Sequence, residues 1–404
     1  MTFIQSKFLS FKIFLKQQLG KPFVFPVYQR SRRYLARNGL FILFRRSLLR
    51  HQYKDVFPRH TTRNGRSAPM AERRNQIPAL LTDTNHAHPL TIGFIITENH
   101  PSTIYGDYFT AHGLGDEMEK YGYRVVYLAE RPRYEWHLLA SIDILVVMRH
   151  TFDPFLLRHY PGITSVAWIR GYVDEWCRAP WFHQYDIVLT TSELSLQYAS
   201  RFTDPGKCLA VLKLAADTRI FRPGPCQTAY EYDISFVGNI FEVPRQFTRS
   251  LTVEPGLTFG IYGNMLDPQH PFRRYHRGTV SHADIPKIYN SSKIVLEDCT
   301  PMCRPWGCVN SRTFEAMACG ACVVSNEVPG LKELFGDALL TYRDREDLRA
   351  TVSWLLSHEE EREKIGTKAR DKIVRRHTYR HRAKDFRNIL FRYFETVPPE
   401  KPAR

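Results

Sequence analysis

The sequence predicts an α/β protein with two doubly wound parallel sheets, preceded by a basic helical arm. Short runs of β-branched residues alternate with helical patterns from about residue 88 onward, which is typical of parallel α/β sheets. A cluster of structure breakers at residues 221–225 divides this series into two halves. The 404 residues, of which 43% are hydrophobic and 13% aromatic, suffice for two packed domains.

The first 75 residues carry almost all of the formal net charge of +16. They hold 17 Lys and Arg but only Asp55 and Glu72, whereas the rest of the chain is close to neutral. The longest apolar run in this arm, residues 40–44, is far shorter than the ~20 residues of a membrane-spanning helix. Three early lysines interrupt the apolar region that a signal peptide needs.

The pattern of the arm favours contact with a membrane surface. Apolar residues recur at helical spacing near its start, and arginines alternate with aromatic and aliphatic residues between positions 32 and 50. Basic amphipathic helices of this kind lie in the interface of an anionic membrane. The alternative is that the arm packs its apolar residues on the main body. We assign residues 1–87 to the arm and predict a cytoplasmic protein, peripheral on the inner membrane face through residues 1–75, without nucleic acid as a partner.

The first domain, residues 88–222, contains six predicted strands. They are residues 91–97, 124–129, 142–148, 164–169, 186–190 and 209–212. Helices are expected at residues 107–121 and after Ser192, whose hydroxyl is a typical helix N-cap.

The second domain, residues 223–378, repeats this alternation. Strands are predicted at residues 233–238, 257–262, 293–297, 321–325 and 338–341, and helices at 283–290, 311–319, 331–335, 346–357 and 359–375. A basic and aromatic helix, residues 379–394, lies in the terminal segment 379–404. Ligands of doubly wound sheets bind at the carboxyl ends of the strands, so site residues are expected there.

The predicted helix 311–319 has the features of a nucleotide site. A helix N-terminus gathers unpaired amide groups and the positive end of the helix dipole, which favours a phosphate. Glu315, one turn inside, can accept two hydrogen bonds from a vicinal diol such as a ribose. The alternative is an ordinary amphipathic helix whose Glu315 faces solvent.

Residues 314–324, F-E-A-M-A-C-G-A-C-V-V, and residues 329–335, P-G-L-K-E-L-F, resemble group 1 glycosyltransferases. The closest likeness is to the branch of spore-maturation CgeB-like glycosyltransferases. It covers residues 230–390 well and residues 90–220 loosely. The resemblance implies the GT-B architecture, in which two Rossmann-like domains face a cleft and a terminal helix crosses back to the first domain. It also implies that Glu315 binds the donor ribose. Many group 1 enzymes carry E-x7-E, but the first glutamate is replaced here by Gly307.

The predicted donor site gathers residues from the second domain. Arginines should neutralise the diphosphate, because the sequence contains no D-x-D motif for a metal. Gly238 permits close backbone approach, Tyr262 could stack on the base, and His282 lies in a segment that resembles the family's nucleobase region. The alternatives are exposed ion pairs for each arginine and a plain loop and helix for residues 278–289. The predicted set is Asn310, Ser311, Arg312, Thr313, Glu315, Gly238, Arg245, Arg249, Tyr262 and His282, with neither a metal nor a cofactor.

Three residues of the first domain are candidate catalytic groups. Asp107, His150 and Asp174 follow or adjoin predicted strands and could act as the general base that an inverting transfer needs. A retaining transfer needs no such base, and His150 would then contact the donor sugar. The alternative for each of them is a structural role.

The eight cysteines are too sparse for a disulfide framework. Cys319 and Cys322 form C-x-x-C, yet they fall at a helix end and in a buried strand. Buried thiols are therefore expected, with zinc as the alternative.

Together these patterns predict a metal-independent glycosyltransferase that moves a sugar from a nucleotide-diphosphate donor to a glycan or lipid-linked acceptor, in surface polysaccharide or glycoconjugate synthesis. One alternative is a GT-B scaffold that binds a nucleotide without turnover, a reading that Gly307 leaves open. Another is a protein that binds an anionic polymer through the basic arm.

Overall fold

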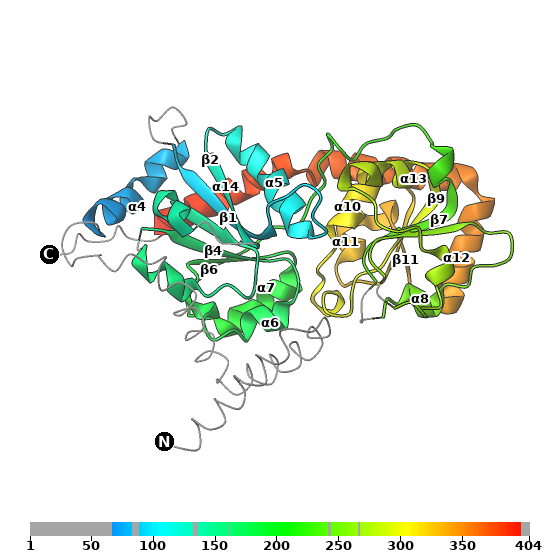
Figure 1. Ribbon diagram of the computed structural model, residues 1–404, viewed down its shortest axis with the longest axis horizontal. Coiled ribbons are helices and arrows are strands. Elements are labelled where there is room, and N and C mark those ends of the chain that lie inside the picture. The colour runs from blue at the N-terminus through cyan, green and yellow to red at the C-terminus, as the bar shows by residue number, and fades with distance from the viewer. Residues whose placement is uncertain are drawn as a thin grey trace, which may run out of the picture. The chain divides into compact units, whose positions relative to one another are not determined.

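The computed structural model describes residues 67–82, 89–131, 136–160, 162–240, 244–265 and 267–396. These residues form two parallel β-sheets with helices packed on them, which confirms the predicted α/β fold (Figure 1). We call the part built on the first sheet the N-terminal lobe and the part built on the second sheet the C-terminal lobe. Most of the predicted membrane-binding arm lies outside the described residues. Within the described residues, no helix is long and apolar enough to cross a membrane.

Six parallel strands form the sheet of the N-terminal lobe, in the order β2-β1-β3-β4-β5-β6. The strands are β1 (Thr91–Glu98), β2 (Arg124–Arg131), β3 (Ile144–Val147), β4 (Thr164–Ile169), β5 (Ile187–Thr190) and β6 (Cys208–Val211). The helices of this lobe are α4 (Ser67–Thr82), α5 (Gly106–Glu119), α6 (Val173–Cys177) and α7 (Glu193–Ala199). β1, β3, β4 and β5 are buried almost throughout, as expected for strands covered on both faces.

Five parallel strands form the sheet of the C-terminal lobe, in the order β11-β10-β9-β7-β8. They are β7 (Tyr232–Val237), β8 (Phe259–Tyr262), β9 (Ser292–Glu297), β10 (Val323–Asn326) and β11 (Leu340–Tyr342). The helices are α8 (Phe247–Ser250), α9 (Ile285–Asn290), α10 (Ser311–Ala318), α11 (Leu331–Phe335), α12 (Arg345–Ser357) and α13 (Glu359–Arg376), and α14 (Tyr379–Thr396) follows them. Every predicted strand overlaps an observed one, whereas α6 and α8 were not predicted.

Each sheet has one point at which the order of its strands reverses. In the N-terminal lobe, β1 pairs with both β2 and β3, and in the C-terminal lobe β7 pairs with both β8 and β9. In the N-terminal lobe, the connections that follow β1 and β3 therefore leave toward opposite faces of the sheet. The same holds for the connections that follow β7 and β9 in the C-terminal lobe. Ligands of doubly wound sheets bind at the carboxyl ends of such strand pairs.

Helix α14 begins after the last helix of the C-terminal lobe and packs on the N-terminal lobe (Figure 1). At its start the ring of Tyr379 covers Gly113 of α5, which has no side chain to obstruct it. Further along, Arg387 Nε donates a hydrogen bond of 2.9 Å to the hydroxyl of Tyr123. Phe386 and Leu390 of α14 are fully buried in the core of this lobe.

The described end of the predicted arm is part of the N-terminal lobe. Helix α4 places Ile77, Leu80 and Leu81 in the same hydrophobic core as α5 and α14. Arg73 Nε lies 2.9 Å from Oδ1 of Asp143, so this cation is engaged by the body of the protein. For residues 67–82, packing on the main body is therefore what the structure shows.

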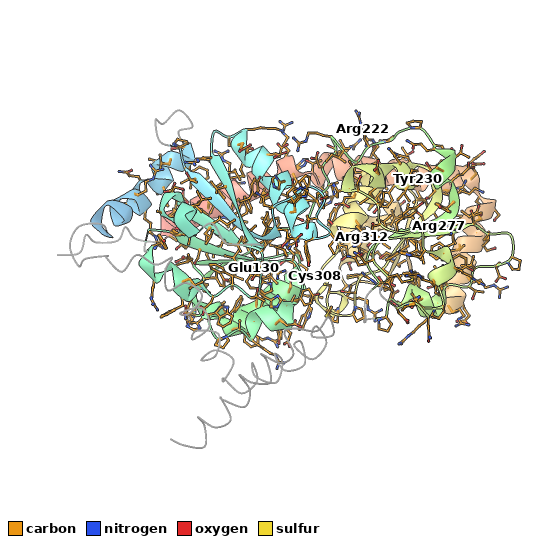
Figure 2. All side chains as sticks on the ribbon, in the orientation of Figure 1. Glu130, Arg222, Tyr230, Arg277, Cys308 and Arg312 are labelled. Atoms are coloured by element: carbon orange, nitrogen blue, oxygen red, sulfur yellow. The ribbon has the colours of Figure 1, made fainter. Side chains whose placement is uncertain are left out.

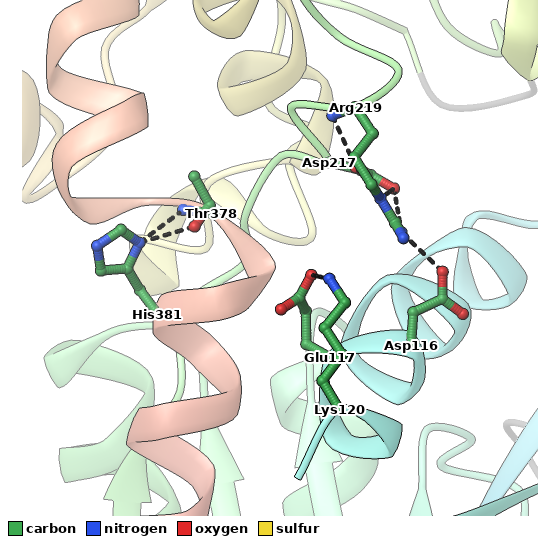
Figure 3. Close-up of polar contacts among 7 residues, drawn as sticks. All are labelled: Asp116, Glu117, Lys120, Asp217, Arg219, Thr378 and His381. Carbon is green, nitrogen blue, oxygen red and sulfur yellow. Dashed lines mark hydrogen bonds and ion pairs between the residues drawn. The ribbon is translucent and has the colours of Figure 1, made fainter.

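Ion pairs connect the segment between the lobes to α5. Arg219 lies 2.7 Å from Oδ2 of Asp217 and 2.7 Å from Oδ2 of Asp116 on α5 (Figure 3). Asp217 and Arg219 border a cavity of about 610 Å³, which is also lined by the end of α5 and by the start of α14. Lys120 and Glu117 pair at 2.5 Å on the same border.

Candidate nucleotide and active site

The carboxyl ends of β7 and β9 bring Gly238 and Arg312 together. β7 ends at Val237, and Gly238 follows it. A Cβ atom on Gly238 would lie 3.1 Å from Cζ of Arg312, so the glycine makes room for the guanidinium. Arg312 Nε donates to Oε1 of Glu297, the last residue of β9, over 3.0 Å. The structure thus places two predicted site residues at the strand-order reversal, of which Figure 2 labels Arg312.

Glu297 keeps Arg312 charged. The carboxylate is 2% exposed and also accepts hydrogen bonds from Asn310 Nδ2 at 3.1 Å and from Thr313 Oγ1 at 3.4 Å. Burial alone would lower the pKa of Arg312, but the attraction of Glu297 outweighs it, and the pKa lies above its usual value. A permanently charged guanidinium therefore lies beside the N-terminus of α10, where the resemblance predicts a diphosphate. No side-chain bond of Ser311 is seen among the described residues.

The two other predicted arginines differ from Arg312 in what they contact. Arg245 is buried and donates to the carbonyl oxygens of Asn239 at 2.7 Å and of Asp298 at 2.7 Å, which fixes the loops after β7 and β9. Burial and the neighbouring Arg312 lower its pKa. Arg249 is exposed on α8, and its carbonyl oxygen accepts from Arg345. Arg245 thus lies at the site as a fixed cation, whereas Arg249 is not brought into the group.

Glu315 is directed toward His282 inside the C-terminal lobe. Its side chain is 8% exposed, and Oε1 lies 3.9 Å from Nε2 of His282, too far for a hydrogen bond. Among the described residues, none donates a hydrogen bond to this carboxylate, and the buried Nε2 of His282 has no hydrogen-bond partner either. The His282 ring stacks on Phe109 of α5, with centroids 3.7 Å apart and planes at 7°. Two predicted site residues therefore face each other with unused hydrogen-bonding capacity.

Tyr262 ends β8 and joins an aromatic cluster. Its hydroxyl lies 3.0 Å from the hydroxyl of Tyr232, and its ring centroid is 5.9 Å from that of Tyr230. Burial, followed by the hydrogen bond to Tyr232, raises the pKa of Tyr262. With only 6% of its surface exposed, Tyr262 contributes to the wall of the lobe, and base stacking stays a prediction.

The three candidate bases of the N-terminal lobe lie in different settings. Asp107, at the start of α5, is buried, and its Oδ2 accepts from Thr97 N at 2.8 Å and from Thr97 Oγ1 at 2.5 Å. His150 follows β3 and stacks on Tyr172, with centroids 5.5 Å apart. Asp174 lies on α6, 2.7 Å from Nε of Arg178. Asp107 and His150 thus follow the strands of the reversal in this sheet, and Asp174 lies on α6, two residues after the Tyr172 on which His150 stacks.

The backbone at Gly307 explains why the first glutamate of E-x7-E is missing. Gly307 has φ of 67°, a left-handed conformation that favours glycine. A Cβ atom there would lie 2.8 Å from the carbonyl oxygen of Pro329. Any contact to the donor sugar must therefore come from other residues.

Loops of the two lobes meet beside this position. Ser192, the N-cap of α7, donates its hydroxyl to the carbonyl oxygen of Trp306. The Trp306 ring lies 4.2 Å from the ring of Tyr198, between centroids. On the same side, a Cβ atom on Gly171 would lie 2.8 Å from Sγ of Cys303.

The cysteines of the C-terminal lobe are buried or half-buried free thiols, except Cys226, which is exposed. Burial raises the pKa of Cys308 to about 11 and that of Cys319 to about 12, so these thiols stay protonated. Within the described part of the chain, no group of three or more His, Cys, Asp or Glu side chains is arranged to hold a metal ion.

Sequence reasoning did not identify Glu297 or Asp298 as candidate site residues, whereas Arg170 was noted within the acceptor-side segment 168–176. Glu297 and Asp298 end a predicted strand as an acidic pair, and this position at the carboxyl end of β9 was the available signal. Burial raises the pKa of Asp298 to about 6. Arg170 follows β4 in the same way, at the carboxyl end of its strand.

Comparisons with known proteins concern both the sequence and the fold. Residues 242–388 match the family model described as glycosyl transferase-like. Among curated proteins, none is similar enough in sequence to count as a match. Among solved structures, a sucrose-phosphate synthase from Thermosynechococcus elongatus has a TM-score of 0.59 at 13% identity, covering 76% of this chain and 100% of that one.

Two further solved structures share this fold. The Anabaena protein Alr3699/HepE, in complex with UDP and glucose, has a TM-score of 0.58 at 13% identity, covering 76% of this chain and 100% of that one. A glycosyltransferase from Rickettsia africae has a TM-score of 0.54 at 12% identity, covering 76% and 99%. The two parallel sheets thus have the GT-B fold, and the C-terminal lobe contains a glycosyl transferase-like sequence.

Proposed function

We propose that this protein is a glycosyltransferase that moves a sugar from a nucleotide-diphosphate donor to a glycan or lipid-linked acceptor. The observation that carries the proposal is the carboxylate of Glu315, whose side chain is 8% exposed, receives no hydrogen bond among the described residues and lies next to the N-terminal turn of α10. A carboxylate that no protein donor engages can accept hydrogen bonds from the hydroxyls of a ligand. The match of residues 242–388 and the GT-B fold support the same reading.

In this proposal the nucleotide binds at the reversal between β7 and β9. Glu315 accepts hydrogen bonds from the ribose hydroxyls, while the amides of α10 and the guanidinium of Arg312 hold the diphosphate. Arg312 lies in place before the ligand binds, because Glu297 fixes it at 3.0 Å. As the bond to the sugar breaks, negative charge grows on the diphosphate, and prepositioned cations stabilise that charge.

Structures similar in fold bind uridine nucleotides. HepE was solved with UDP and glucose, and a phage T4 protein of TM-score 0.51 was solved with UDP-glucose. UDP and UDP-sugars are therefore the first donors to test. The acceptor side is the N-terminal lobe, in which Asp107 and His150 follow the strand pair β1 and β3. We further propose a CgeB-like enzyme of surface polysaccharide synthesis that acts without a metal at the inner face of the membrane.

A thermal-shift screen of nucleotide-sugars tests the donor site. One nucleotide-sugar should raise the melting temperature of the wild type, because a ligand at 100 times its Kd adds about 2.7 kcal/mol of stability. This effect should largely disappear in Glu315→Ala, which has no carboxylate to accept hydrogen bonds from the ribose hydroxyls. Glu333→Ala, an exposed glutamate on α11, is the matched control and should keep the full shift. An undiminished shift in Glu315→Ala would contradict the site.

Turnover separates an enzyme from a binding protein of the same fold. The enzyme releases the free nucleoside diphosphate by transfer or by slow hydrolysis, and chromatography of the incubated donor measures this release. A nucleotide-sugar that binds in a Glu315-dependent manner but is never cleaved would support the scaffold alternative.

A further inference from the structure

Arg170 lies at the carboxyl end of β4, where the lobes meet. It directly follows Ile169, the last residue of that strand. The next residue, Gly171, approaches Cys303 of the C-terminal lobe so closely that a Cβ atom there would lie 2.8 Å from the thiol sulfur. Arg170 is therefore on the edge of the N-terminal sheet at which a doubly wound fold binds its ligand.

The guanidinium of Arg170 has no partner among the described residues. Its Nε is buried and makes no hydrogen bond, and no ion pair involves this side chain. Buried arginines elsewhere in the chain differ in this respect. Arg245 donates to two loops, Arg312 pairs with Glu297, and Arg382 donates to Nδ1 of His377 at 2.8 Å. The Arg170 residue as a whole is half-buried, and a half-buried guanidinium that no protein group pairs can pair with an anionic ligand.

The neighbouring charges do not satisfy Arg170. Burial lowers the pKa of Arg170, and the negative charge of nearby Asp107 offsets part of this shift. The Oδ2 atom of Asp107, however, already accepts two hydrogen bonds from Thr97. Arg149 contributes a second positive charge nearby, and Glu130 engages it at 2.9 Å. The surroundings therefore leave one guanidinium available to an anion from outside the chain.

We propose that Arg170 binds an oxyanion carried by the acceptor, so that the acceptor substrate of this enzyme bears a phosphate or carboxylate group. This inference rests on the proposed function. The donor residues Glu315 and Arg312 belong to the C-terminal lobe, whereas Arg170 belongs to the N-terminal lobe, the acceptor side of the GT-B fold. The two terminal amino groups of a guanidinium form a planar fork that matches the two oxygens of a phosphate or carboxylate.

A titration with inorganic phosphate, followed by thermal denaturation, tests the anion site. Phosphate should raise the melting temperature of the wild type. The phosphate concentration that gives half of this increase should be at least tenfold higher in Arg170→Gln. Arg170→Lys should recover only part of the effect, because an ammonium cannot form the fork. Arg201→Gln, an exposed arginine of the same lobe, is the control and should behave as the wild type. The general salting effect of phosphate is the same in all variants. Equal phosphate curves for wild type and Arg170→Gln would overturn the proposal.

Two further measurements distinguish this inference from the proposed function. UDP should shift the melting temperature of Arg170→Gln as much as that of the wild type. If UDP binding and phosphate binding fall together in Arg170→Gln, the guanidinium serves the donor diphosphate and the inference is wrong. If no nucleotide shifts the wild type while the phosphate effect still depends on Arg170, the proposed function fails and the anion site stands. Acetate in place of phosphate separates a carboxylate site from a phosphate site.

The unliganded variant provides a check that needs no ligand. Removal of a half-buried charge that no protein group pairs should leave the melting temperature of Arg170→Gln equal to or above that of the wild type. A large loss of stability would show that Arg170 supports the fold and would contradict a ligand-binding role.

Discussion

Neighbouring acids at the end of β9 have opposite electrostatic roles. Glu297 and Asp298 are both almost fully buried. Glu297 faces Arg312 and stabilises its charge, whereas Asp298 accepts a hydrogen bond from the amide of Phe247 at 2.8 Å but forms no ion pair in the described structure. Burial consequently raises the pKa of Asp298 to about 6. One step along the chain thus separates an acid that pairs with Arg312 from an acid without an ion pair whose pKa is raised by burial.

Asp298 should make stability depend on pH in a predictable direction. Its folded pKa of about 6 lies above the unfolded value of 3.8. Because the folded protein holds this proton more tightly than the unfolded chain, the contribution of Asp298 to the free energy of unfolding is fully present below pH 3.8. It is lost as the pH rises through about 6, and the loss amounts to roughly 2–3 kcal/mol. Asp298→Asn has no titrating group there, so its stability relative to the wild type should increase over this range.

Urea denaturation of both proteins at a series of pH values measures this difference. Asp204→Asn, an exposed acid in a turn, is the control and should differ from the wild type by a constant amount. A parallel pH profile for Asp298→Asn and the wild type would show that the carboxyl is not perturbed.

Local spacing in the sequence was enough to predict that Gly238 follows a strand and that Arg312 and Glu315 lie in the first turns of a helix. These residues end a strand or begin a helix, so their positions follow from the nearest element alone. The role of Arg245 could not be predicted, because its partners are backbone carbonyls that become neighbours only after β7 and β9 pair. The lack of a hydrogen-bond partner at Arg170 Nε could not be predicted for the same reason, since the neighbours of this side chain are set only when the chain folds.

The helices α5 and α14 pack closely because of a single glycine. A Cβ atom on Gly113 would overlap three atoms of the Tyr379 ring, whereas Gly106, in the first turn of the same helix, has no neighbour within 4 Å of such an atom. Close packing leaves no room for an added methyl group unless the ring moves.

Gly113→Ala and Gly106→Ala form a matched pair on one helix. The first should lower the free energy of unfolding by about 1–3 kcal/mol, since the added methyl overpacks the contact with Tyr379. The second should be neutral or stabilising by up to about 1 kcal/mol, because alanine is the better helix former. Chemical denaturation measures both, and Tyr379→Leu should recover part of the loss in the Gly113→Ala background. Equal effects of the two alanines would contradict the packing.

The long elements were predictable and the short ones were not. Buried parallel strands appear as continuous runs of apolar residues, so all predicted strands overlap observed ones to within a few residues. α6 and α8, of five and four residues, are too short to show a helical period. The division of the arm was also missed, because α4 is covered by α5 and α14, which lie far from it in the sequence.

For the whole molecule, the charge of the arm has to be divided between two parts. Arg73 and Arg74 of α4 pair with Asp143 and Asp186 of the N-terminal lobe, so they belong to the fold. The other basic residues of the arm belong to residues 1–66, which lie outside the described residues.

Deletion of residues 1–64 should separate membrane binding from nucleotide binding. The full chain should sediment with vesicles rich in phosphatidylserine, and less so as salt is added, because screening weakens the attraction. The shortened chain should remain in solution and keep its nucleotide-dependent thermal shift, while neutral vesicles should bind neither protein. If the shortened chain still binds vesicles, the arm is not the membrane anchor. The same holds if the full chain binds RNA but not vesicles and the deletion abolishes that RNA binding.

The position of α14 also determines when the protein can finish folding. The helix fills part of the N-terminal lobe, but it is translated about 170 residues after β6, the last strand of that lobe. During synthesis the apolar residues of α4 and α5 that α14 covers in the folded protein stay exposed until the last helix leaves the ribosome. Nascent chains that stall before residue 379 should therefore need chaperones to stay soluble, since exposed apolar surface promotes aggregation.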